Sequence, residues 1–79
     1  MARDLLTVVV AARDEADALP LLHARLAPVL DAMRADGIDG RVLYVDDGST
    51  DGTWQVMRGL ASGDRRVALL RLSRNFGKE

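Results

Sequence analysis

Three short apolar runs, separated by longer segments of mixed polarity, restrict the possible folds of this chain most strongly. They cover residues 5–10, 41–45 and 67–72, and the first is rich in β-branched valine. A continuously apolar run of this length is typical of a strand that is covered on both faces, and such strands are usually parallel. The runs therefore predict three parallel strands.

The segment between the first two runs has the apolar spacing of an amphipathic helix. Over residues 16–35, apolar residues recur three or four positions apart, at Leu19, Leu22, Leu26, Val29 or Leu30, and Met33. Pro20 fits the first turn, whereas Pro28 falls in the middle, where the missing N–H predicts a bend. Residues 36–40 have the glycine-rich chemistry of a helix end and a turn.

A second helix is predicted between the second and third runs. Ser49, Thr50 or Asp51 can cap its amino terminus, and residues 62–64 end it. Its apolar face would carry Trp54, Met57, Leu60 and Ala61. We expect Trp54 to serve packing and Arg71, inside the third strand, to lie at an edge or to cover apolar surface. We expect His23 to have no chemical role, and Arg65 and Arg66 to form a solvated turn.

The order strand, helix, strand, helix, strand predicts a βαβαβ unit of the α/β class. Right-handed crossovers would place both helices on one face and give the strand order 3-2-1. One face and the edge of the first strand would then be uncovered, although the strands are apolar on both sides. We therefore expect residues 1–79 to be a single partial domain, truncated after the third strand, with an open edge capable of self-association.

The composition excludes several classes of protein. A formal net charge of −1, with 48% hydrophobic residues, lacks the strong positive field of a nucleic-acid-binding protein. Without cysteine and with one histidine, disulfides and zinc sites with thiolate ligands are excluded. The longest apolar run, residues 5–12, is far shorter than the roughly 20 residues that span a bilayer. We expect this chain to be cytoplasmic and not to enter a membrane.

Two adjacent carboxylates, Asp46 and Asp47, follow the second strand directly. Loops after parallel strands converge at one edge of the sheet, where such folds bind ligands. Residues 11–15, 46–49 and 73–78 would meet there as an acidic pocket with a basic rim. Asp47 can accept hydrogen bonds from a nucleobase or a ribose, and Arg74 and Lys78 can face phosphates. Alternatively, one aspartate caps the second helix, the other is solvated, and the basic pair belongs to a solvated loop.

Two motifs carry a resemblance to a known family. Val-Asp-Asp-Gly-Ser-Thr-Asp-Gly-Thr at residues 45–53 resembles the signature of family 2, GT-A-fold glycosyltransferases. Arg-Leu-Ser-Arg-Asn-Phe-Gly-Lys-Glu at residues 71–79 resembles the branch of dolichol-phosphate mannosyltransferases and bacterial polyprenyl-phosphate sugar transferases. The resemblance implies that this chain is the three-stranded, Rossmann-like half of a GT-A nucleotide-diphospho-sugar transferase fold.

The resemblance also implies which residues bind the donor. Asp47 would contact the base, with Asp46 and Val45 beside it, and Glu15 matches the acid of the family's first loop. That loop usually reads Pro-x-Tyr-Asn-Glu, whereas Ala11, Arg13 and Asp14 stand here for the proline, tyrosine and asparagine. Arg13 could stack on the base in place of the tyrosine, or the site has drifted. The residues implied in nucleotide-sugar binding are Ala11, Arg13, Glu15, Val45, Asp46, Asp47 and Lys78.

The family's Asp-x-Asp metal motif and its catalytic residues have no counterpart in these 79 residues. The resemblance implies that the complete enzyme uses Mg²⁺ or Mn²⁺, a GDP- or UDP-linked sugar donor and a polyprenyl or dolichyl phosphate acceptor, at the cytoplasmic face of a membrane. We expect this chain alone to be inactive, without catalytic or metal-binding residues and without tight metal binding.

The alternative is a stand-alone α/β binding or regulatory module that uses the acidic pair for metal or phosphate. Receiver domains, however, keep their acidic pair after the first strand, and a dinucleotide-binding Gly-x-Gly-x-x-Gly turn is also missing.

Overall fold

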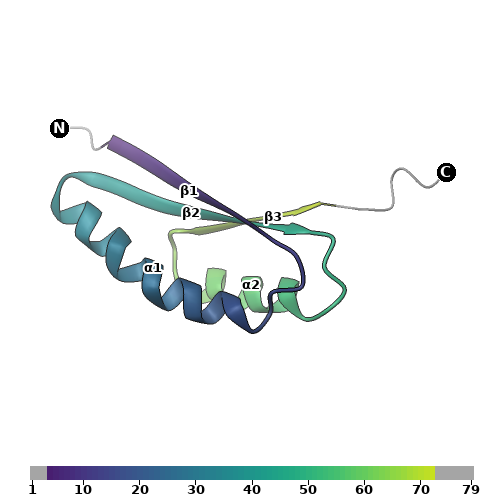
Figure 1. Ribbon diagram of the computed structural model, residues 1–79. Helices are drawn as coiled ribbons and strands as arrows, with labels where there is room; N and C mark the ends of the chain where they lie inside the picture. Colours follow the sequence, from purple (N-terminus) through teal and green to yellow (C-terminus); the bar gives the residue numbers. More distant parts are fainter. Residues whose placement is uncertain (1–3, 73–79) are drawn as a thin grey trace.

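The computed structural model describes residues 4–72, which form a three-stranded parallel sheet with two helices (Figure 1). The elements along the chain are β1 (Asp4–Ala12), α1 (Ala18–Ala35), β2 (Ile38–Asp47), α2 (Thr53–Gly63) and β3 (Val67–Leu72). The strand order is β1-β2-β3, and both neighbouring pairs are parallel. The predicted α/β class, the element order and the central position of the second strand are confirmed.

Both helices pack on the same face of the sheet (Figure 1). The register aligns Val8 with Val42 and Val67, and Val10 with Tyr44 and Leu69. The core consists of buried residues from this face and from the helices, namely Ala12, Leu19, Leu30, Val42, Tyr44 and Met57. The predicted one-sided arrangement of the helices is therefore correct.

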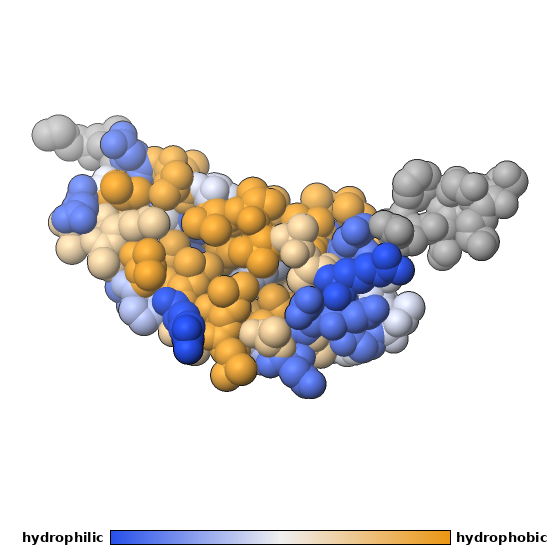
Figure 2. Space-filling model, in the orientation of Figure 1, coloured by the Kyte–Doolittle hydropathy of each residue, from blue (hydrophilic) through white to orange (hydrophobic). Residues whose placement is uncertain are grey.

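The opposite face of the sheet is apolar and uncovered among the described residues. Its strand residues Leu5, Val9, Leu70 and Leu72 are 65%, 61%, 47% and 43% exposed. Figure 2 shows hydrophobic surface extending over the strands and along α1. Packing against the helices therefore explains the apolar residues on one face of the strands, but nothing among the described residues covers those on the other face.

The second strand begins earlier than the sequence predicts. Residues 38–40 were expected to form a turn, yet β2 begins at Ile38, because β1 already begins at Asp4 and pairs with it. Gly37, at φ +80°, makes the turn that ends α1. Gly40 lets α1 approach closely, since a Cβ there would lie 2.9 Å from both Leu30 Cδ2 and Met33 Sδ.

Helix α1 continues through Pro28, which is exposed. The proline leaves the carbonyl oxygen of Ala24 without an intrahelical donor, and solvent can satisfy this oxygen because Ala24 is also exposed. Pro20 lies in the first turn, as predicted.

A polar chain crosses the core between the sheet and α1. Buried His23 lies with Nδ1 2.8 Å from the Tyr44 hydroxyl and with Nε2 3.0 Å from Asp64 Oδ2. The sequence suggested no partner for His23, because Asp64 follows it by 41 positions and is brought to it only by the packing of the helices. The side chain is a structural link between α1, β2 and the loop before β3.

Candidate functional site

The loops after β1 and β2 lie side by side at the carboxyl edge of the sheet, at the same end of the molecule (Figure 1). The register brings Ala12 opposite Asp46, so the two chains leave the sheet at the same level. This agrees with the expectation that the loops after parallel strands converge. Arg74 and Lys78, the expected basic rim, lie outside the described residues 4–72.

Asp46 and Asp47 do not form a pair, because successive residues of a strand face opposite sides of the sheet. Asp46 faces the helices and is fully buried. Its Oδ1 accepts a hydrogen bond of 3.0 Å from the Ser49 N–H, which closes the turn into α2, and Gly48 makes that turn at φ +76°. Asp46 therefore shapes the turn.

The second carboxylate oxygen of Asp46 is buried without a hydrogen-bond partner among the described residues. It forms an ion pair with Arg71, whose Nε lies 3.8 Å away. Arg71 also lies over the ring of half-buried Trp54, with 5.1 Å between the guanidinium carbon and the ring centroid. Trp54 packs against the core, so the packing role predicted for it is correct.

Asp47 is half-buried and faces the open side of the sheet. On this side it follows Val45, which is 9% exposed and lies opposite exposed Ala11 of β1. Three of the residues expected in the site, Ala11, Val45 and Asp47, thus share one face, whereas Asp46 belongs to the other. A ligand at this edge would meet Asp47 before Asp46.

The loop after β1 is tied to the loop after β2 through Asp14. Its Oδ1 accepts hydrogen bonds from the backbone N–H groups of Thr50 at 2.8 Å and Asp51 at 3.3 Å. In return, the Asp14 N–H donates to Ser49 Oγ at 2.9 Å. Asp14 has a left-handed backbone with φ 54°, which aspartate tolerates better than most residues.

Thr53 and Asp51 add further bonds between the same two loops. The buried hydroxyl of Thr53 accepts from the Glu15 N–H at 2.9 Å and donates to Asp51 Oδ1. The N-cap of α2 is Gly52, without a side-chain capping bond, so the expected cap at Ser49, Thr50 or Asp51 is wrong. Asp51, one residue before it, nevertheless accepts at Oδ1 from the Thr53 N–H at 2.9 Å. These bonds, chiefly that from the Thr53 hydroxyl, lower the pKa of Asp51.

Glu15 and Arg13 are both exposed at this edge. Glu15 lines a small hollow of about 160 Å³ beside the edge of β1, between the strand and the first turns of α1. Its other lining residues are apolar, namely Val10, Ala11, Ala12, Ala18, Leu19 and Leu22. Of the expected site residues within residues 4–72, only Ala11 and Glu15 line this hollow.

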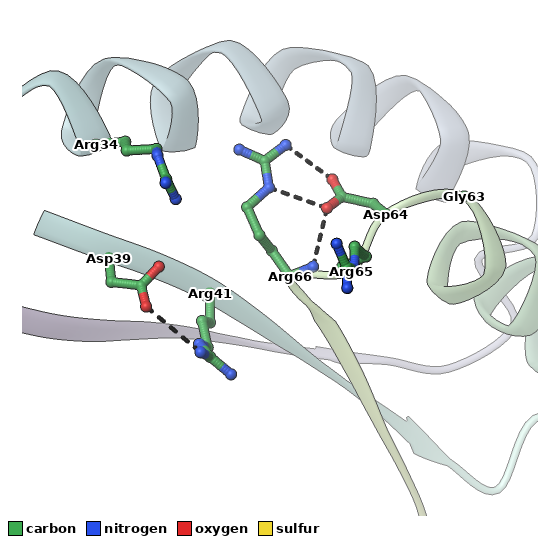
Figure 3. Close-up of a pocket in the computed structure, with 7 residues that line it drawn as sticks. All are labelled: Arg34, Asp39, Arg41, Gly63, Asp64, Arg65 and Arg66. Carbon is green, nitrogen blue, oxygen red and sulfur yellow. Dashed lines mark hydrogen bonds and ion pairs between the residues drawn. The ribbon is translucent and has the colours of Figure 1, made fainter.

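A larger hollow, of about 530 Å³, lies at the opposite edge of the sheet (Figure 3). It is lined by Arg34, Asp39, Arg41, Gly63, Asp64, Arg65 and Arg66. Figure 3 shows Arg66 reaching from the start of β3 to the carboxylate of Asp64. This hollow lies away from the loops after β1 and β2, and its lining includes none of the expected site residues.

The structure corrects the expectation that Arg66 belongs to a solvated turn. Its side chain is only 28% exposed, donates to Asp64 at 2.9 Å from both Nε and Nη2, and lies 2.7 Å from Asp31 of α1. The hydrogen bonds from Arg66 hold the pKa of Asp64 well below its usual range. The expectation was wrong because the turn packs against α1, which the local sequence does not reveal.

The described residues do not fit a divalent cation. Among residues 4–72, no three histidine, cysteine, aspartate or glutamate side chains are grouped as ligands. Hard cations require several oxygen ligands, and Asp46 and Asp47 face opposite sides of the sheet. Over the same part of the chain, no helix is long and apolar enough to cross a membrane.

Asp14, Ser49 and Thr53 were not predicted to link the two loops. From the sequence, Asp14 is a departure from a family pattern, Ser49 is a possible cap, and Thr53 is part of a motif. A short polar side chain followed by an acid in each loop was the available signal, but it does not reveal which residues pair across 35–38 positions.

Comparison with known proteins identifies the family of the chain. Residues 7–79 match the family model described as glycosyl transferase family 2. The chain is 36% identical over 74 residues to an uncharacterized glycosyltransferase, sll0501, of Synechocystis sp.. This match covers 94% of this chain and 22% of that protein. It is 30% identical over its full length to CsbB of Bacillus subtilis, a candidate glycosyltransferase of which it covers 23%.

The chain therefore spans less than a quarter of the length of these curated relatives. The family match nevertheless includes β2, the acidic turn and both helices. The chain therefore belongs to glycosyl transferase family 2.

Proposed function

We propose that this chain forms the donor-nucleotide-binding part of a glycosyltransferase that uses a nucleotide-linked sugar. The observation that supports this most directly is the placement of Asp47 on the open face of the sheet, at the carboxyl edge where α/β folds bind ligands. A carboxylate there can accept two N–H groups of a nucleobase or two ribose hydroxyls.

In this proposal, Asp47 contacts the base, and Ala11 and Val45 form the apolar surface beside it. Glu15 and Arg13 approach from the neighbouring loop, with the Arg13 guanidinium stacking on the base, and Lys78 contributes from outside the described residues. Asp46 belongs to the site as the residue that shapes the turn, since its carboxylate is buried beneath it.

The finer parts of the proposal are the donor and the acceptor. We propose a GDP- or UDP-linked donor and a polyprenyl or dolichyl phosphate acceptor, which the resemblance of residues 71–79 supports. The described residues hold no grouping of ligands for the Mg²⁺ or Mn²⁺ that such a transfer would use.

Calorimetric titration with GDP and with UDP tests the proposed binding. The variant Asp47→Asn should weaken binding by about tenfold, because an amide replaces one acceptor oxygen with a donor. Asp39→Asn is the matched control, since Asp39 lies on the same strand and face but at the opposite end. Binding of neither nucleotide, or equal losses in the two variants, would contradict the proposal.

Transfer to the acceptor is tested in an enzyme of the relatives' length that contains this chain. Incubation with a donor labelled in its sugar should yield a polyprenyl phosphate that carries the labelled sugar. A product formed only on a soluble acceptor would refute the proposed acceptor class.

A further inference from the structure

The two loops of the proposed donor site are held together mainly by polar bonds. Hydrogen bonds from Asp14, Glu15 and Ala16 reach residues 49–53 across 35–38 positions of sequence. Asp14 makes more of these bonds than any other residue of its loop. A movement of either loop would have to break this set.

Asp14 is an unusual residue to find in this role. It is exposed and contributes nothing to the core, and its left-handed backbone costs free energy in a residue other than glycine. A conformation of this kind persists only where surrounding interactions hold it, and such positions are common at functional sites. Here the holding interactions are the Thr50 and Asp51 N–H groups, both received by Oδ1.

The position of Asp14 joins the two loops that carry the proposed ligand contacts. Glu15 follows it directly, and Asp47 lies three residues before Thr50, the residue that Asp14 holds most closely. Glu15 belongs to the loop after β1, whereas Asp47 is the last residue of β2, directly before the loop that Asp14 holds. The bond therefore fixes the loop of Glu15 against the end of the strand that carries Asp47.

We propose that Asp14 is a positioning residue, which holds the loops after β1 and β2 in one arrangement so that Glu15 and Asp47 contact the same nucleotide. The inference rests on the proposed function, since it assigns Asp14 a role in donor binding. Asp14 itself acts through the Thr50 and Asp51 N–H groups and does not need to touch the nucleotide.

Three substitutions separate positioning from charge and from backbone strain. Asp14→Gly removes the acceptor while keeping the left-handed backbone accessible, and should weaken GDP or UDP binding by about tenfold. Asp14→Asn keeps the Oδ1 acceptor and the backbone preference, and should bind within about twofold of wild type. Asp17→Asn removes the same charge three residues away, where the side chain makes no capping bond, and should leave affinity unchanged.

A double-mutant cycle distinguishes positioning from general destabilisation. If Asp14 acts through the placement of Asp47, Asp14→Gly should cost less than about twofold in an Asp47→Asn background. An equal tenfold loss in both backgrounds would overturn the inference. So would a loss in Asp14→Asn as large as that in Asp14→Gly, because it would indicate direct charge recognition of the ligand.

Amide hydrogen exchange tests the link without nucleotide. In the unliganded chain, the Thr50 and Asp51 amides should exchange at least about tenfold faster in Asp14→Gly than in wild type, and near the wild-type rate in Asp14→Asn. Unchanged exchange would overturn the inference even if the nucleotide binds. If wild type binds no nucleotide while exchange responds as expected, the proposed function fails and the positioning role fails with it.

Discussion

The hydroxyl of Tyr44, in the middle of the central strand, lies 2.8 Å from Nδ1 of His23 on α1. An ionised Asp64 carboxylate can only accept, so a neutral His23 ring carries its proton on Nε2, and its Nδ1 then accepts from the Tyr44 hydroxyl. Burial, and then the charge of Asp64, raise the pKa of Tyr44. The phenol thus remains a donor within the core.

Tyr44→Phe should destabilise the chain by about 1–2 kcal/mol, because it leaves the buried Nδ1 of His23 without its donor while the ring packing is kept. Urea unfolding would measure the change in midpoint. In a His23→Ala background the same substitution should cost clearly less, and additive losses would contradict the bond.

The stability of the chain should fall as the pH falls below about 4, for a reason centred on Asp64. Hydrogen bonds from Arg66 lower the pKa of Asp64 in the folded state, and those from Thr53 lower that of Asp51. A carboxyl whose pKa is lower in the folded than in the unfolded state contributes stability that is fully present above the unfolded-state pKa. This stability is lost progressively as the pH falls from the unfolded-state pKa towards the folded-state pKa. Thermal unfolding between about pH 6 and about pH 3 would record the decrease in Tm.

Asp64→Asn is the variant that tests this assignment. It should lower Tm near pH 6, since it weakens the links to Arg66 and His23, and it should make Tm less dependent on pH. Asp17→Asn should keep the wild-type dependence, because Asp17 makes no capping bond. If Tm depended on pH as steeply in Asp64→Asn as in wild type, Asp64 would be excluded as the source of the pH dependence.

Thr53→Val should destabilise the chain by about 1–3 kcal/mol, because it keeps the shape of a fully buried side chain but removes its hydroxyl. The Glu15 N–H loses its acceptor, and Asp51 loses a donor. Thr50→Val is the control, since that hydroxyl is exposed and its contact with Asp14 is long, at 3.4 Å, so the change should stay within about 0.5 kcal/mol. Equal effects in chemical unfolding would refute the role of the Thr53 hydroxyl.

Two glycines should respond to alanine in opposite directions. Gly59 lies exposed inside α2 with no atom near an added Cβ, so Gly59→Ala should stabilise the chain by about 0.5–1 kcal/mol. Gly40→Ala should destabilise it by about 1–3 kcal/mol, because the added Cβ would lie 2.9 Å from Leu30 and Met33. Thermal unfolding of both variants checks the pair, and a gain in Gly40→Ala would show that α1 can move away at no cost.

The elements and their order were predictable from local patterns. The apolar runs at residues 5–10 and 67–72 lie in β1 and β3, and the helical spacing over residues 16–35 corresponds to α1. Such patterns are visible within a short window of sequence, because the burial of one face requires apolar residues at regular spacing. The early start of β2 at Ile38 was not predictable, since pairing with Asp4 rather than local preference extends it.

For the site, the sequence alone determined the family, the carboxyl edge of the sheet and the turn at Asp46 and Asp47. Only the tertiary structure assigned the two carboxylates to opposite faces, and only it joined Asp14 to Thr50, His23 to Asp64 and Arg66 to Asp31. These partners lie 35–41 residues apart. Hydrogen bonds act over about 3 Å, so such pairs are decided by how the helices and loops pack on the sheet.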